Sequence, residues 1–139
     1  MTDTGQPSEK RYVPAASTVA FVGALCFRFP QLQPLLAEHL QGNLGQVLPY
    51  IFLDDVRRWI MDRVEQFGAS DSEAKAVLDF CDEVFAKTAI DDDLCTLIAI
   101  EIVESLRQDG DAGRKVIAMF GPQLRDETAR QDNWRPGQS

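Results

Sequence analysis

The spacing of the apolar residues constrains the fold of this chain more than any other feature of its sequence. Between positions 56 and 67 the apolar residues fall at i, i+3, i+4, i+8 and i+11, and mostly charged residues lie between them. An α-helix of about 3.6 residues per turn places residues so spaced on one face. We therefore expect a helix that buries this face, which is made by Val56, Trp59, Ile60, Val64 and Phe67.

Comparable spacing predicts five to six helices in all, and no stretch of the chain alternates as a strand does. The segment 94–106 is apolar around most of its circumference, which is typical of a central helix that several others contact. We expect Ile98 and Ile102 to be buried there. The predicted class is all-α, a compact bundle of antiparallel helix pairs, because short loops join antiparallel neighbours.

The predicted helices from the third to the sixth begin at a regular interval. Their starts are about 20 residues apart, so that a pair takes about 40 residues, as in helical-pair repeats such as HEAT. No residue pattern repeats itself at that interval. HEAT-like stacking is therefore an architectural analogy and not a predicted repeat.

A single domain is expected at positions 14–130, because 139 residues suit one compact hydrophobic core. Positions 1–13 are polar and are expected to form a disordered arm. Positions 131–139 are expected to form a polar tail, in which Trp134 is the one apolar side chain. That ring either docks onto the domain or is available to a partner.

Local patterns predict where several elements begin and end. Ser17 is the expected N-cap of the first helix, and Gly68 is expected to end the third. The run 70–73 has the form of a capping box. The apolar connector 47–53 is interpreted as a buried linker or as one helical turn that enters the third helix. A last helical turn is expected from Gln123 to about Arg130.

Acidic residues dominate the middle of the chain. The whole sequence has 22 acids and 14 bases, and positions 54–111 alone hold 16 acids and 6 bases. Such a segment repels phosphate backbones, which argues against direct nucleic-acid binding, and it attracts a basic protein. The candidate partner-binding residues are the acids predicted to face outward from the third to the fifth helices: Asp62, Glu65, Asp79, Asp82, Glu83, Asp91 and Asp92.

The residues that most often bind metals are few and scattered. The cysteines are Cys26, Cys81 and Cys95, with no Cys-x-x-Cys pair, and His39 is the one histidine. We expect reduced core thiols, as in a cytoplasmic protein, and neither a disulfide nor a metal site. The aspartates at 91–93 are expected to cap a helix, because consecutive residues diverge by about 100° around a helix axis.

Motifs for enzymatic chemistry and for membranes are missing from the sequence. It has no GxSxG, no GxxxxGK[ST] and no GxGxxG, so we expect neither a catalytic site nor a cofactor. The first residues do not have the form of a secretory signal. No uncharged apolar run approaches the roughly 18 residues of a membrane span. The expected location is the cytoplasm.

Several segments together resemble a known family. They are Phe29-Pro30, the run from Leu48 to Trp59 with the pattern Leu-Pro-x-x-Phe-x-x-Asp-Val-x-x-Trp, the helix 94–106 and the segment 120–124. The chain resembles a bacterial family of small helical proteins that is described only as a domain of unknown function. The resemblance implies a single helical domain and supplies no catalytic residues. Size and charge also resemble those of immunity proteins of bacterial toxin systems.

The favoured function is therefore that of a non-enzymatic, acidic binding protein. It would be an immunity or inhibitor protein that occludes a toxin or another basic partner through charge complementarity. One alternative is a regulatory protein–protein interaction module, or a homodimer, with no toxin partner. The third hypothesis is an enzyme of unrecognised type, which would bring polar residues together in a pocket.

Overall fold

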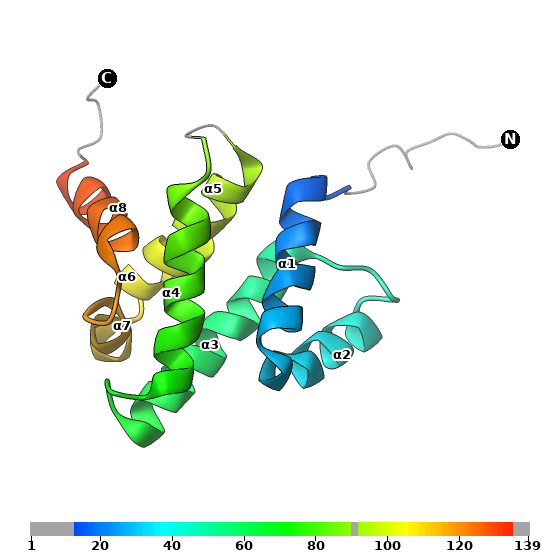
Figure 1. The fold of residues 1–139 in the computed structure, drawn as a ribbon, viewed down its shortest axis with the longest axis horizontal. Coiled ribbons are helices and arrows are strands. Elements are labelled where there is room, and N and C mark those ends of the chain that lie inside the picture. Colours follow the sequence, from blue (N-terminus) through cyan, green and yellow to red (C-terminus); the bar gives the residue numbers. More distant parts are fainter. Residues whose placement is uncertain (1–12, 90–91, 135–139) are drawn as a thin grey trace, which may run out of the picture.

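The computed structural model describes residues 13–89 and 92–134, and every regular element within them is a helix (Figure 1). The all-α class is thus confirmed. Positions 1–12 of the predicted arm, positions 135–139 of the predicted tail and Asp91 lie outside the described residues. The elements are α1 (Ala16–Arg28), the 3-10 turn η3 (Pro30–Leu32), α2 (Gln33–Gly42), α3 (Pro49–Phe67), α4 (Ser72–Ala86), α5 (Asp93–Ile98), the π-helical segment η4 (Ala99–Glu104), α6 (Ser105–Arg107), α7 (Gly110–Ile117) and α8 (Pro122–Asn133).

Elements α5, η4 and α6 follow one another directly and form the central helix of the bundle. This helix packs against α1, α3, α4, α7 and α8, and Figure 1 shows it crossing behind α4. Ile98, Ile102 and Leu106 have no exposed surface. The prediction of a central helix with Ile98 and Ile102 buried is therefore confirmed.

The π-helical segment explains why the central helix is apolar on so many sides. Buried residues in this segment pair with residues at the end of α5 five positions earlier, Ile102 with Leu97 and Val103 with Ile98. Five α-helical residues turn through about 500°, which would leave the members of a pair about 140° apart. A π-helix bonds each residue to the one five positions away, so its wider turn directs both members of each pair to the core.

Two predicted helix starts are wrong by one or two residues. Ser17 lies inside α1, whose N-cap is Ala15 because that residue has the extended backbone of a cap (φ −65°, ψ 142°). Ser70 does not cap α4. Asp71 does, since its Oδ2 accepts the backbone N–H of Ala74 at 2.9 Å.

The connector 47–53 follows one of the two expected interpretations, a helical turn that enters the third helix, because α3 begins at Pro49. The extent of another element differs from that expected. The predicted last turn ending near Arg130 is a full helix, α8, that continues to Asn133. The predicted end of the third helix is confirmed at Gly68, where φ is 88°, a left-handed value that favours glycine.

The first two helices do not form the antiparallel pair that was expected. The chain turns through 114° between α1 and the η3–α2 segment, at Pro30, which lacks the backbone N–H that would continue α1. Within residues 13–89 and 92–134, no single helix is long and apolar enough to cross a membrane. The bent pair of α1 with η3 and α2 does pass that test of length and composition.

The predicted stripe of α3 is buried along its middle and open at one edge. Ile60 has no exposed surface, but Phe67 is 52% exposed and Trp59 is only half-buried. The prediction that Trp59 is buried is therefore wrong. Trp59 packs against the core with part of its surface only, and Arg63 lies beside it, with its guanidinium 5.5 Å from the Trp59 ring centre and 4.7 Å from that of Phe67. This edge of α3 is therefore shared between the core and a charged side chain.

Two of the three cysteines are buried among core side chains, as predicted. Cys26 and Cys81 are 4% and 0% exposed. Burial raises the pKa of Cys26 to about 11. Burial, together with the nearby Asp82 carboxylate, raises the pKa of Cys81 to about 12. Both thiols are therefore protonated at neutral pH and are poor nucleophiles.

His39 ties the end of α2 to the start of α3. Its ring is 4% exposed, and Nε2 accepts the backbone N–H of Leu48 at 2.9 Å. Because a protonated imidazole cannot accept, this bond requires the neutral ring. Burial lowers the pKa of His39 below 6.5, an effect that the carboxylate of Asp55 partly opposes.

This geometry predicts that His39 makes folding sensitive to mild acid. The depressed pKa means that stability is fully present above about pH 6.5 and is lost as the pH falls towards the folded-state pKa. The urea unfolding free energy of the wild type should fall between about pH 7 and pH 5, and that of His39→Gln should fall less. Equal pH slopes for the two proteins in this window would contradict the assignment.

Candidate functional site

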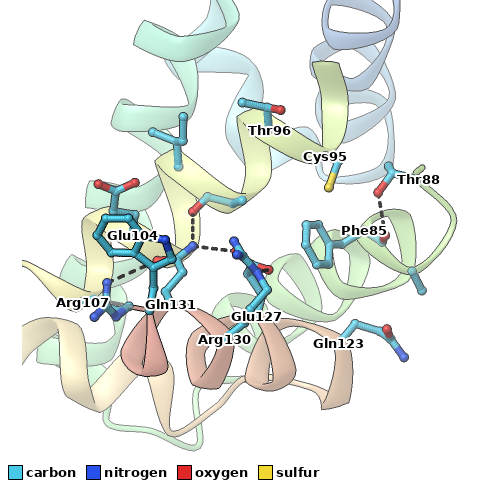
Figure 2. Close-up of a pocket in the computed structure, with 14 residues that line it drawn as sticks. Phe85, Thr88, Cys95, Thr96, Glu104, Arg107, Gln123, Glu127, Arg130 and Gln131 are labelled. Atoms are coloured by element: carbon cyan, nitrogen blue, oxygen red, sulfur yellow. Dashed lines mark hydrogen bonds and ion pairs between the residues drawn. The ribbon is translucent and has the colours of Figure 1, made fainter. Parts of the chain in front are cut away.

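A pocket of about 690 Å³ lies between the end of α4, the central helix and α8. Figure 2 shows how side chains from these three regions meet there. Phe85 and Cys95 lie on one side of the pocket, Glu104 and Arg107 lie on the other, and Glu127 lies between them. The volume of the pocket is in the range of small-ligand sites, about 300–1,000 Å³.

The π-helical segment lines one wall of this pocket. Cys95, Ala99, Ile100 and Glu104 all line the pocket and recur at intervals of four and five residues, which share a face where the helix is wide. Side chains satisfy two of its carbonyl groups, because Gln131 Nε2 donates to Ala99 O at 3.1 Å and the Ser105 hydroxyl donates to Ile100 O at 3.1 Å. The wide turn therefore carries no unpaired carbonyl at either position.

A carboxylate that is 8% exposed organises the α8 side of the pocket. Glu127 accepts two hydrogen bonds from Arg130, at 2.8 and 2.6 Å, and one from Gln131 at 2.8 Å. Burial acts to raise the pKa of Glu127, but the bonds from Arg130 and Gln131 outweigh it and hold that pKa below its usual value. The carboxylate is therefore ionised, and its oxygens are already engaged.

The second arginine of the pocket is also paired. Arg107 Nε donates to Asp132 at 2.8 Å, and its Nη1 donates to Gln131 at 3.3 Å. Glu104 lines the same wall, and its carboxylate makes no hydrogen bond or ion pair with any described residue. Its carboxylate is thus the unmatched charge of the pocket.

The third cysteine lies here and not in the core. Cys95 is half-buried and lines the pocket, so the prediction of a core thiol is wrong for this residue. Cys95 lies in α5, before the π-helical segment, on the face of the central helix that lines the pocket. Among the described residues, no three histidine, cysteine or acidic side chains lie where they could share a metal ion. The tail residue Trp134 also lines the pocket and is 57% exposed.

Four of the candidate partner-binding acids are exposed as predicted. Asp62 and Glu65 lie on the outer side of α3, and Asp79 and Glu83 lie one turn apart on the outer side of α4. Glu65 is 3.6 Å from Lys115. Asp79 is paired with a lysine of its own helix at 2.8 Å.

The fifth acid, Asp82, does not face outward, and that prediction is wrong. It is 9% exposed, and its Oδ1 accepts the backbone N–H of Leu124 at 2.8 Å. The first turn of a helix leaves N–H groups unbonded, and the N-cap of α8 is Gly121, which has no side chain. A carboxylate from α4 supplies the missing acceptor, so Asp82 holds two helices together.

The remaining candidates do not join the others. Asp92 caps α5 by accepting the N–H of Leu94 at 2.8 Å, which confirms the predicted capping role, and Asp91 lies outside the described residues. Asp62 precedes α4, whereas Asp92 follows it. The 15 residues of α4 span about 22 Å, so the structure brings together Asp79 and Glu83 and does not gather all the acids into one cluster.

Sequence reasoning missed the pocket altogether. The apolar spacing places the polar residues of this pocket on a short last turn and on a regular central helix. One pattern could have indicated them, because Glu127, Arg130 and Gln131 have the i, i+3 and i+4 spacing of side chains that meet on a helix. Nothing local to Glu104 marks it as a pocket residue.

Comparison with known proteins identifies a family and nothing more specific. A family model described as Domain of unknown function (DUF7674) matches residues 22–135. No curated protein and no solved structure matches the chain. The match confirms the coarser part of the resemblance, a domain family of unknown function. The bacterial origin and the likeness to immunity proteins stay predictions.

Proposed function

We propose that this chain, which belongs to the family Domain of unknown function (DUF7674), is a non-enzymatic binding protein for a basic protein partner. The partner would be a toxin or another basic enzyme, neutralised in the bacterial cytoplasm as an immunity protein neutralises its toxin. The exposed carboxylates of this chain attract the basic partner, and the bound chain covers the active site of that partner. Complementary charge of this kind acts mainly on the rate of association.

The observation that carries this proposal is a surplus of exposed carboxylates that no base neutralises. Asp62 and Glu83 are exposed and form no ion pair with any described residue. A basic partner would supply the missing counter-charges. Most of the described bases already lie in ion pairs: Arg57, Arg58, Arg63, Lys75, Arg107, Arg114, Lys115 and Arg130.

The chemistry of the pocket supports a binding role over a catalytic one. A general base needs a carboxylate that can take up a proton near neutral pH, but Glu127 is held ionised by Arg130 and Gln131. A cysteine nucleophile is usually activated by an adjacent base. The one histidine of the sequence is engaged with the backbone of Leu48.

Reversing charge on the outer face of α4 should slow association with the partner. After affinity capture and identification of the partner, we expect Asp79→Lys with Glu83→Lys to lower the association rate about tenfold at low salt. Both side chains are exposed, so the melting temperature should stay nearly unchanged. Asp82 is left intact, because its bond to Leu124 stabilises the fold.

A second double variant shows whether the position of the reversed charges affects the association rate. Glu38→Lys with Asp111→Lys makes the same change in net charge at exposed positions on α2 and α7, and we expect it to slow association less. Equal effects would mean that net charge acts without a defined surface. An association rate that ignores both variants, or capture of a second copy of this chain alone, would contradict the proposal and favour the regulatory or homodimeric alternative.

A further inference from the structure

The charges inside the pocket leave one carboxylate without a counter-ion. Arg130 is held by Glu127 through hydrogen bonds of 2.6 and 2.8 Å, and Arg107 donates to Asp132 at 2.8 Å. Glu104, at the end of η4, is half-buried, and its carboxylate makes no hydrogen bond or ion pair with any described residue. The pocket therefore carries surplus negative charge at Glu104, on the wall where Figure 2 shows that side chain.

The rest of the wall suits a long cationic side chain. Phe85 and Trp134 contribute aromatic rings, and a guanidinium or ammonium group binds favourably against the face of such a ring. Ala99 and Ile100 offer apolar surface on which the methylene groups of the side chain can pack. The volume of about 690 Å³ has room for one such side chain and the backbone beside it.

We propose that this pocket is the anchor site for an arginine side chain of the basic partner. The inference rests on the proposed function and names the chemistry of the contact. The guanidinium pairs with Glu104, while its methylene groups lie against Ile100. A charged pair shielded from water acts mainly on dissociation, whereas the exposed Asp79 and Glu83 act on association.

The principal rival is an anionic ligand bound by the two arginines of the pocket. To bind, an anion must compete with Glu127 for Arg130 and with Asp132 for Arg107. It would disturb charge-assisted hydrogen bonds that are already made. A cation gains Glu104 as a partner and does not compete for the hydrogen bonds of Arg130 and Arg107. The balance of charge therefore favours the cation.

The test uses the isotope-labelled full chain and an end-blocked Ala-Arg-Ala peptide, with amide chemical shifts as the readout. We expect saturable shifts confined to the pocket amides, including those of Cys95, Ala99 and Gln131. Glu104→Gln keeps the shape of the side chain and removes its charge. This variant should bind the arginine peptide at least about tenfold more weakly than the wild type. The neutral citrulline analogue should bind the wild type at least about tenfold more weakly than the arginine peptide.

A matched control separates the pocket from the overall field of the protein. Glu38→Gln makes the same charge change on the exposed face of α2, and the affinity of the peptide should change by less than about twofold. The proposal is overturned by an absence of shifts, by equal binding of citrulline and arginine, by an unchanged affinity in Glu104→Gln, or by tighter binding of Ala-Glu-Ala. If the peptide does not bind while charge reversal at Asp79 and Glu83 still slows association with the partner, the anchor site is rejected and the proposed function stands.

Discussion

Replacing Gly113 with alanine is expected to destabilise the protein by about 3 kcal/mol or more. A Cβ atom at this position would overlap the backbone carbonyl oxygen of Leu106, because α7 returns closely against the end of the central helix. A backbone atom cannot swing aside as a side chain does, so α6 and α7 would have to separate. Unfolding in urea, monitored by circular dichroism, measures the loss.

Gly23 provides the matched control for that substitution. It lies in the middle of α1 and is exposed, and a Cβ atom there would meet nothing within 4 Å. Gly23→Ala should leave stability unchanged or raise it by up to about 1 kcal/mol, because alanine favours helix. A Gly113→Ala protein as stable as Gly23→Ala would contradict the close packing of α7 on α6.

Replacing Arg57 with methionine is the second change with a large expected effect, a loss of about 3–5 kcal/mol. The side chain is largely buried and sits among three carboxylates: Nη1 is 2.6 Å from Asp54 and 3.7 Å from Glu101, and Nε is 3.0 Å from Asp109. The pKa of Glu101 is already raised, mainly by burial and to a smaller extent by the nearby carboxylate of Asp54. Without the arginine, like charges on α3, η4 and the start of α7 face one another unopposed.

The pH dependence of Arg57→Met distinguishes this cause from a simple loss of packing. Arg57 acts to lower the pKa of Glu101, so loss of this cation lets Glu101 take up a proton more readily, and the deficit in unfolding free energy should shrink as the pH is lowered from about 7 to 5. Arg58→Met is the control, since Arg58 is 62% exposed and should cost less than about 1 kcal/mol. A deficit for Arg57→Met that is the same at both pH values would point to packing alone.

The helices could be predicted from the sequence because the apolar spacing of a helix is a local property. The position of Asp82 could not, since it lies at the edge of the polar face of α4 and its partner, the N–H of Leu124, is 42 positions away. Periodicity decides which face of a helix is polar. Periodicity does not decide whether the first turn of a later helix will pack against that face.

The pocket was beyond local reasoning for a related reason. Its walls come from α4, the central helix and α8, which meet only in the folded chain. The π-helical turn rotates Glu104 onto this wall, although the apolar pairs five positions apart, such as Leu97 with Ile102, were visible in the sequence. Local periodicity assigns these pairs to a central helix that is apolar around most of its circumference, whereas the structure has a wide π-helical turn there.

The measurement that tests the binding role most directly is the association rate of the wild-type chain with its captured partner at low and high salt. Salt shortens the range of exposed charges from about 30 Å at 0.01 M to about 3 Å at 1 M. If exposed carboxylates such as Asp62 and Glu83 attract the partner, the rate should fall at least about tenfold over this range. A rate that stays flat from low to high salt would contradict an acidic binding surface.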